Sequence, residues 1–261
     1  MSNIFLKRKT LKQVPPLKWA VMFFRVLKRK HGVTATIKEF FEFSRDWRTY
    51  QKLHKNPSFT LTTGDIYPHL FDKTKETPLD PVYFYQDTWC ARKIFENKPA
   101  HHYDVGSKAD LIGTISQFVP TTMVDIRPLE VTLPELSFVK GSILDLPFKD
   151  GEVSSLSSIC VIEHIGLGRY GDMLEPFGSE KAAKELSRIL APGGSLYISV
   201  PIDSKNRVYF NAHRAFTRDY LLKIFSPLTP VEEKYIYGNT IYDTYYPQKG
   251  FGTGLYHLKK I

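Results

Sequence analysis

The chain has 261 residues, of which 42% are hydrophobic and 14% aromatic, so it can bury the core of one large domain with an appended segment. Its two cysteines, Cys90 and Cys160, are too few for a disulfide framework or a zinc site. Cys160 lies in an apolar run, and we expect it in the core. No apolar run approaches the roughly 20 residues of a membrane span. No cleavable secretory signal is evident, which favours a cytoplasmic location.

The net charge of +9 is unevenly placed, with a dense basic set in residues 1–55. Pro15 and Pro16 suit the start of a helix, and Gly32 suits its end. Basic and apolar side chains are interleaved between them: Lys18, Trp19, Phe23, Phe24, Arg25, Leu27, Lys28, Arg29 and Lys30. Such a helix can pack on the main domain or lie on an anionic membrane surface. It can also neutralise nucleic-acid phosphates, which is the least favoured of three open interpretations.

Helical spacing of aromatic side chains predicts a second helix over residues 36–53. Residues 56–81 are polar and broken by prolines, which predicts an ordered loop. A further helix is predicted over residues 87–97. We therefore divide the chain into a basic helical extension with its loop, residues 1–82, and a main domain, residues 83–261.

Residues 103–201 alternate between apolar runs and helical segments, and acids stand where the apolar runs end. These acids are Asp104, Asp125, Asp145 and Glu163. Strands that alternate with helices predict a parallel sheet, which binds ligands at the carboxyl ends of its strands. Asp125 follows the first acid by about 20 residues, the spacing of a carboxylate that binds a ribose. The pattern predicts a site for an adenosine-containing cofactor.

The last 60 residues predict a short helix over residues 218–225, capped by Thr217, and two late strands over residues 234–237 and 254–259. With these two strands the predicted sheet would have seven strands. The expected fold is α/β, with a Rossmann-like, doubly wound, mostly parallel seven-stranded sheet and an amino-terminal helical extension.

The motifs in this region resemble, in order, those of class I S-adenosylmethionine-dependent methyltransferases. They are residues 104–106, Asp125, residues 144–148, residues 161–164 and residues 190–194. The longer strings 163–172 and 210–214 are similar to a narrower branch of methyltransferase-like proteins associated with bacterial surface-glycan synthesis. The general resemblance covers about residues 100–261. It implies S-adenosyl-L-methionine as cofactor and an antiparallel last strand.

The first loop departs from the family pattern of three alternating glycines, which let the backbone approach the cofactor. Gly106 keeps its place, but Lys108 and Asp110 occupy the other two positions, and Gly113 comes late. A non-catalytic or scaffold relative therefore stays open beside an active enzyme.

The resemblance implies a set of cofactor-binding residues at the strand ends. Asp125 would bind the ribose hydroxyls, Asp145 would accept a hydrogen bond from the adenine amino group, and Glu163 would brace its loop. The full set is Asp104, Gly106, Ser107, Asp125, Ile126, Arg127, Asp145, Leu146 and Glu163.

Two histidines compete as the base that removes a proton from a hydroxyl acceptor: His164, just past the fourth strand, and His213. The glycine-rich loop between residues 166 and 171 suggests a cover over the substrate. Its Arg169 and Tyr170, together with Asp172, would contact sugar hydroxyls or a phosphate. No cluster of residues has metal-ligand spacing, so metal dependence is disfavoured. Aromatic and polar residues of the preceding helix would line the pocket or lie in the core: Tyr83, Tyr85, Gln86 and Trp89.

Two classes of function follow from these features. One is an O-methyltransferase that acts on a small-molecule or lipid-linked sugar in surface-glycan biosynthesis. The other is a cofactor-binding scaffold without turnover. The basic charge also suggests an RNA methyltransferase, but the Asn-Pro-Pro-Tyr type of signature for exocyclic base nitrogens is missing after the fourth strand.

Overall fold

The computed structural model describes residues 33–261, which fall into two units divided between Pro78 and Leu79. The predicted basic helix of residues 15–32 lies outside the described residues. In the first unit, helix α2 (Val33–Leu53) confirms the predicted second helix and begins three residues earlier. It is followed by a short 3-10 helix, η1 (Thr63–Asp65). None of the helices within residues 33–261 is both long and apolar enough to cross a membrane.

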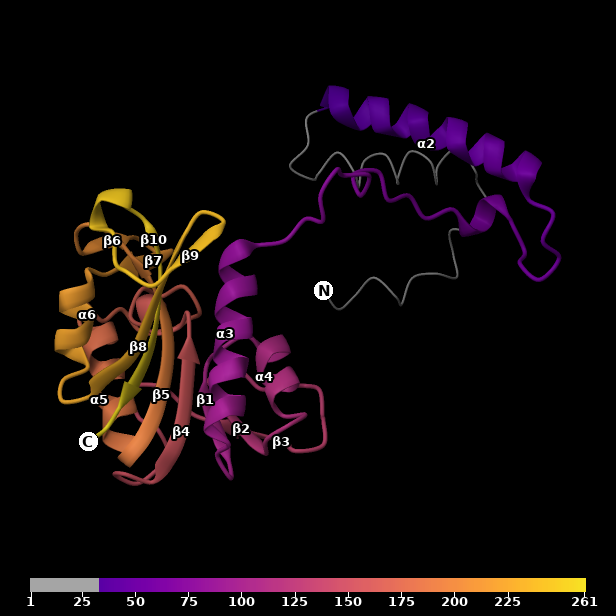
Figure 1. The fold of residues 1–261 in the computed structure, drawn as a ribbon. Coiled ribbons are helices and arrows are strands. Elements are labelled where there is room, and N and C mark those ends of the chain that lie inside the picture. The colour runs from indigo at the N-terminus through magenta and orange to yellow at the C-terminus, as the bar shows by residue number, and fades with distance from the viewer. Residues whose placement is uncertain (1–32) are drawn as a thin grey trace. The chain divides into compact units, whose positions relative to one another are not determined.

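The second unit is built on an eight-stranded sheet in the order β3-β2-β1-β4-β5-β10-β8-β9 (Figure 1). The neighbouring pairs from β3 to β5 are parallel, and β10 runs antiparallel to both β5 and β8. The strands are β1 (His102–Val105), β2 (Thr121–Asp125), β3 (Leu136–Lys140), β4 (Val153–Ile159), β5 (Leu190–Ile202), β8 (Thr229–Tyr237), β9 (Thr240–Tyr242) and β10 (Gly252–Lys259). This confirms the Rossmann-like fold and the antiparallel last strand. The sheet has one strand more than predicted because β9 pairs with β8 at its edge.

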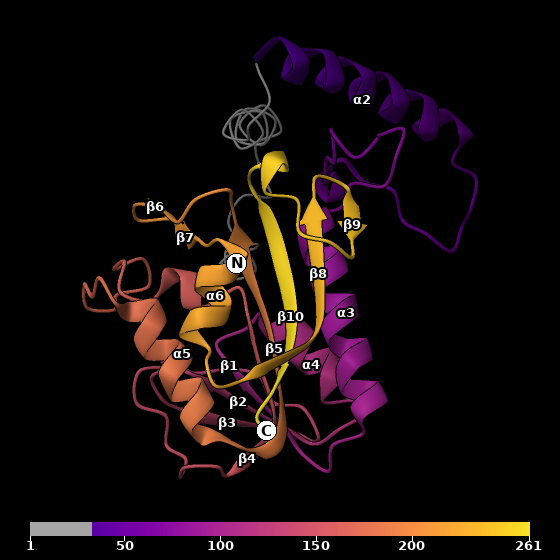
Figure 2. The ribbon, with the colours of Figure 1, turned by 60° about the vertical axis from the view of Figure 1, so that its left-hand side comes forward.

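Helices cover both faces of this sheet, as Figures 1 and 2 show. On one face, α3 (Pro81–Asn97) and α4 (Ala109–Ile115) contribute to an apolar cluster that includes Ile94 and Ile112. On the other face, α5 (Gly178–Ile189) and α6 (Arg218–Ile224) bury Leu186 and Leu221. The strands between the two clusters are buried on both sides, which is why they read as apolar runs in the sequence.

Local sequence signals explain where α3 and α6 begin. Asp80 caps α3, and its carboxylate accepts hydrogen bonds from the backbone N–H groups of Val82 and Tyr83. Thr217 caps α6 as predicted, and its hydroxyl accepts from Tyr220 N–H. The helix predicted over residues 87–97 is longer than expected, because Pro81 suits the first helical position.

A small hairpin that was not predicted follows β5. It consists of β6 (Arg207–Tyr209) and β7 (His213–Ala215) and forms a separate two-stranded sheet. Two further 3-10 helices are η2 (Ile162–His164) and η3 (Pro247–Lys249). The hairpin and η2 both follow the carboxyl ends of central strands, where the site was predicted.

Candidate functional site

The carboxyl ends of β2, β1 and β4 lie side by side, since these strands are parallel neighbours. The segments that leave them carry Arg127, Gly106 and Glu163 respectively. This is the edge at which open α/β sheets bind ligands. The strand order therefore brings the predicted cofactor residues of three loops to one place.

A buried polar network supports this edge from beneath. The Asp104 carboxylate accepts hydrogen bonds from Ser107 N–H at 3.0 Å, Ser107 Oγ at 2.5 Å and Ser157 Oγ at 2.6 Å. Ser107 Oγ in turn accepts from Ile159 N–H at 2.8 Å. Because Ser157 donates to Asp104, it accepts from His102 Nε2–H, 2.9 Å away. Burial raises the pKa of Asp104 to about 6, and its hydrogen bonds act in the opposite direction.

This network involves two predicted cofactor residues. Asp104 is 0% exposed, and both Asp104 and Ser107 use their polar side-chain atoms on protein partners. Both side chains therefore have a structural role, and a direct contact of either with the cofactor stays a prediction. They tie the end of β1 to β4 and so fix the loop that carries Gly106.

Gly106 is required by packing at this loop. Its φ is +74°, and a Cβ there would lie 2.9 Å from Cγ1 of Val161, the residue before η2. The two family glycine positions that Lys108 and Asp110 occupy carry an exposed ion pair, with Nζ and Oδ2 3.0 Å apart. The loop is therefore held by Asp104, Ser107 and Gly106.

Asp125 ends β2, and its carboxylate is paired with Arg127. Oδ1 accepts from Arg127 N–H at 2.8 Å and Nε–H at 3.2 Å, while Oδ2 accepts from Nη2–H at 3.1 Å. The Arg127 guanidinium also lies 4.8 Å from the centre of the Tyr170 ring. Ile126, between them in sequence, is 40% exposed. A ribose at Asp125 must share this carboxylate with Arg127 or displace it.

The loop after β3 carries two predicted cofactor residues, one exposed and one buried. Asp145 is exposed, and its backbone N–H donates to Ser142 O. Leu146 is buried in the apolar core, and Glu185 accepts from its N–H at 2.8 Å. Arg188 donates to its carbonyl. The Leu146 side chain is therefore part of the core and its backbone groups have protein partners, and its cofactor contact stays a prediction.

Glu163 is a buried carboxyl with a free oxygen. It is 1% exposed, and its Oε2 has no hydrogen-bond partner within the described part of the chain. Burial raises its pKa to about 8, although its own backbone N–H, Cys160 and Arg169 act in the opposite direction. An unpartnered polar atom in a protein interior is costly, and it calls for a ligand or a proton.

Cys160 lies beside Glu163 rather than in the core strand where it was expected. It follows the last residue of β4 with φ +53° and is partly exposed. Its thiol donates to Gln86 Oε1 at 3.1 Å, and Ser199 Oγ donates to the same oxygen at 3.0 Å. Gln86 therefore reaches the site from α3.

The aromatic residues of α3 lie in two different surroundings. Burial raises the pKa of the Tyr83 hydroxyl, and Lys108 Nζ lies 5.7 Å from the centre of the Tyr83 ring, so Tyr83 adjoins the loop after β1. Trp89 Nε1 donates to Glu232 and Tyr85 Oη donates to Asn239 O, both on the β8–β9 side.

His164 has a defined tautomer. Its Nδ1 lies 2.7 Å from the Ala212 carbonyl, which can only accept, so Nδ1 carries the proton. Nε2 then holds a lone pair, 3.6 Å from Glu163 Oε1. Burial lowers the pKa of His164 to about 4, and Arg169 and His213 contribute further. His164 is a neutral, anchored ring.

His213 begins β7 and contrasts with His164. Its ring contacts those of Tyr209 and Phe251, with centroids 5.1 and 5.5 Å away. Its ring nitrogens make no hydrogen bond to any described residue. Burial lowers its pKa, and the charge of Arg169 adds to the effect. His213 is therefore a neutral ring whose nitrogens are available.

The loop after η2 holds two of the predicted substrate residues in the open. Arg169 Nη1 donates to the Ala212 carbonyl at 2.9 Å, and its guanidinium lies 5.2 Å from the centre of the Tyr170 ring. The Tyr170 ring also meets His164 edge-on at 5.6 Å. Asp172 instead accepts from Gly166 N–H at 2.6 Å and Tyr170 N–H at 3.3 Å. Asp172 therefore braces the loop, and its substrate contact stays a prediction.

Arg214 is a site residue whose role the sequence did not reveal. It is buried, and its guanidinium donates to the carbonyls of Ile165, Glu175 and Pro176 and to Ser179 Oγ. It thereby ties both ends of the η2–α5 loop to the β6–β7 hairpin, and the two segments lie together in Figure 2. Its position beside His213 in the sequence gave no sign of these hydrogen bonds.

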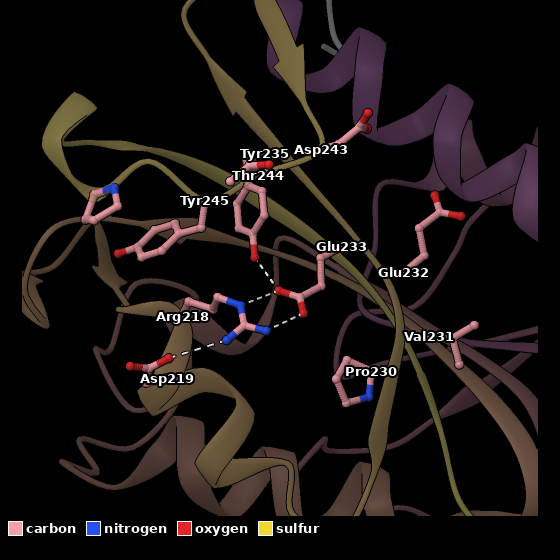
Figure 3. A pocket seen from close by; sticks show the side chains of 11 residues that line it. Arg218, Asp219, Pro230, Val231, Glu232, Glu233, Tyr235, Asp243, Thr244 and Tyr245 are labelled. Atoms are coloured by element: carbon pink, nitrogen blue, oxygen red, sulfur yellow. Dashed lines mark hydrogen bonds and ion pairs between the residues drawn. The ribbon is translucent and has the colours of Figure 1, made fainter.

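An open hollow of about 680 Å³ lies elsewhere, among α6, β8 and residues 243–247 (Figure 3). Arg218 bonds both carboxylate oxygens of Glu233 at 2.6 Å, and Tyr235 Oη donates to the same group. None of the predicted site residues lines this hollow. Within residues 33–261, no group of three or more His, Cys, Asp or Glu side chains is placed to hold a metal ion.

The fold is that of class I S-adenosylmethionine-dependent methyltransferases. A proposed sarcosine dimethylglycine methyltransferase from Galdieria sulphuraria superimposes with a TM-score of 0.52 at 12% identity, over 68% of this chain and 86% of that one. The [4+2]-cyclase SpnF superimposes with a TM-score of 0.50 at 13% identity, over 67% and 80%. One is described as a methyltransferase and the other as a cyclase, so the shared fold does not by itself fix the reaction.

Sequence comparison adds little to this result. A family model described as a Caenorhabditis protein of unknown function, DUF268, matches residues 150–228. This segment runs from before β4 to just past α6 and includes η2 and the β6–β7 hairpin. No curated protein sequence matches the chain.

Proposed function

We propose that the chain is an S-adenosylmethionine-dependent methyltransferase that methylates a sugar hydroxyl in surface-glycan biosynthesis. The observation that carries the proposal is the pair of carboxyl groups, Asp125 and Glu163, that flank the Gly106 loop at the ligand-binding edge of a methyltransferase fold. The sugar acceptor, small or lipid-linked, follows from the resemblance of residues 163–172 and 210–214 to the surface-glycan branch.

The residues present fit the cofactor. The unpartnered Oε2 of Glu163 suits an ammonium group, because a buried carboxyl without a donor ionises most readily beside a cation. Asp125 suits a pair of ribose hydroxyls, and exposed Asp145 suits the adenine amino group. When bound, the cofactor supplies an electrophilic methyl group on a sulfonium, so the protein needs mainly to hold an acceptor oxygen in line.

The two histidines take different roles in this proposal. His213 is the preferred base, because its ring nitrogens have no partner among the described residues and its lowered pKa keeps it unprotonated at neutral pH. His164 is a positioning residue. Its Nδ1–H holds the Ala212 carbonyl, and this contact fixes the backbone directly before His213.

A cofactor-binding domain without methyl transfer is the second candidate. The observation that favours it is the Arg127 fork on Asp125, which occupies both oxygens that a ribose needs. The similarity to a cyclase is in keeping with this candidate.

The proposal is tested by incubating the full chain with S-adenosylmethionine that is isotopically labelled in its methyl group and a panel of sugar phosphates and nucleotide sugars. We expect label in a sugar product that alkaline treatment does not release, because an ether is stable where an ester is not. Cofactor binding with no labelled product from any sugar would favour the second candidate.

A further inference from the structure

Two further aromatic rings, on the β6–β7 hairpin and just before β10, gather around His213. Tyr209, His213 and Phe251 contact one another, with centroid separations of 5.1, 5.5 and 6.1 Å. Tyr209 is 39% exposed and Phe251 is 51% exposed. Exposed aromatic faces that cluster beside a functional site are typical of ligand binding. We call these three residues the aromatic platform.

The platform is held in place from behind. Tyr209 Oη donates to Asp203 Oδ2 at 3.2 Å, and Tyr245 Oη donates to the Asp203 carbonyl at 2.7 Å. Phe251 follows Gly250, whose φ of +73° turns the chain into β10. Rings that are fixed before binding lose little conformational freedom when a ligand arrives.

A cation adjoins the platform. Ala212 directly precedes His213, and its carbonyl accepts from Arg169 Nη1, while the Arg169 charge lowers the pKa of His213. No carboxylate of the described chain forms an ion pair with Arg169, although Arg127, which packs on the same Tyr170 ring, is paired with Asp125. An exposed guanidinium that forms no ion pair with a carboxylate suits a phosphate or carboxylate of a ligand.

We propose that the aromatic platform and Arg169 form the acceptor subsite, and that the acceptor is a sugar that carries an anionic group. The apolar face of a pyranose ring packs on Tyr209 and Phe251, while a hydroxyl faces the free nitrogens of His213 and the anion binds Arg169. The assignment rests on the proposed methyl transfer for the role of His213. The subsite itself rests on the ring contacts and the unpaired cation.

Substitutions on the platform have a matched control on the same chain. Phe95 and Phe118 form another exposed aromatic pair, with centroids 5.8 Å apart, on α3 and just after α4. Phe251→Leu keeps apolar volume but removes the ring face, and Phe95→Leu makes the same change away from the site. We expect Tyr209→Ala and Phe251→Leu each to weaken binding of a sugar phosphate by about 3- to 10-fold. Phe95→Leu should leave it unchanged.

The test is an NMR titration of the full chain, isotopically labelled at histidine. Glucose 1-phosphate, glucose and inorganic phosphate are added in separate experiments. The His213 ring signal is identified by its loss in His213→Gln. We expect glucose 1-phosphate to shift this signal at concentrations where glucose and phosphate do not. Arg169→Ala should abolish the advantage of glucose 1-phosphate over glucose.

Two results would overturn the subsite: a His213 signal that does not respond to glucose 1-phosphate, or equal affinities in Phe251→Leu and Phe95→Leu. Repeating the titration with S-adenosylhomocysteine separates this proposal from the preceding one. If S-adenosylhomocysteine does not bind but the His213 shift persists, methyl transfer fails and the subsite stands. If it binds and no shift occurs, the subsite alone fails.

Discussion

Gly106 and Val161 lie so close that a Cβ on Gly106 would stand 2.9 Å from Cγ1 of Val161. The contact joins the loop after β1 to the residue that precedes η2, and these two segments carry the predicted cofactor contacts. Packing between two loops thus requires a glycine here, although the other glycines of the family pattern are absent.

Gly106→Ala should lower the free energy of unfolding by more than the roughly 1 kcal/mol that a left-handed alanine costs, because Val161 must also move. Gly193→Ala is the matched control: Gly193 has the same φ of +74° and no atom within 4 Å of its Cβ position. Urea unfolding of both variants measures the difference. Equal losses would show that the Val161 contact contributes nothing.

Strands were the most predictable part of this fold, because buried parallel strands appear as apolar runs that end in polar residues. The eighth strand was missed, although Gly238 and Asn239 form a two-residue turn signal between β8 and β9. With only three residues, β9 has too little periodicity to be recognised. The short β6–β7 hairpin was missed for the same reason.

The candidate site was predictable in its location but not in the role of each side chain. Strand order follows from local pattern and handedness, so the acids could be placed at one edge. The hydrogen-bond partner of a side chain depends on residues far away in sequence. Glu185 satisfies Leu146 from 39 positions away, and Ser157 satisfies Asp104 from 53.

Glu163 should make the stability of the protein depend on pH. Its pKa is raised to about 8 from 4.5, so the folded state holds this proton more tightly than the unfolded state. The stabilisation is complete below about pH 4.5 and is lost as pH rises through about 8, at up to about 1.4 kcal/mol per pH unit. Glu163→Gln stays neutral and should be more stable than the wild type above pH 8.

Urea unfolding of both proteins across this range checks the effect. Buried Asp104 also titrates near pH 6, but it is present in both proteins and cancels in the comparison. Glu130→Gln makes the same replacement at an exposed position and provides the control. A Glu163→Gln curve parallel to the wild-type curve would contradict the raised pKa.

The two histidines should separate in methyl-transfer kinetics. His213→Gln should lower kcat by roughly 10²–10⁴-fold and leave S-adenosylhomocysteine affinity intact. His164→Gln should have a smaller effect, since its ring positions the chain before His213. Because the pKa of His213 is lowered from 6.5, the activity of the wild type should fall only at a pH below 6.5. A greater loss of kcat in His164→Gln than in His213→Gln would make His164 the base and His213 the positioning residue.

The basic residues 18–30 lead us to expect binding to anionic vesicles at low salt. Each Lys or Arg near such a surface contributes about 1 kcal/mol, and salt screens the attraction. Replacing Lys28, Arg29 and Lys30 by Glu should abolish co-sedimentation without altering cofactor affinity. Replacing Lys73, Lys75 and Lys98 by Glu changes the net charge equally and serves as the control. Equal loss in both variants would mean that overall charge, rather than this segment, governs binding.

Calorimetric titration of S-adenosylhomocysteine into the full chain and its Asp125→Ala variant tests the central claim most directly. A charge-assisted bond between Asp125 and a ribose is worth about 1.5–3 kcal/mol, so the account predicts binding to the wild type and at least about ten-fold weaker binding to the variant. Asp219→Ala, which removes a carboxylate in an exposed ion pair with Arg218, should match the wild type. A wild-type chain that does not bind, or an Asp125→Ala variant that binds equally well, would contradict the account.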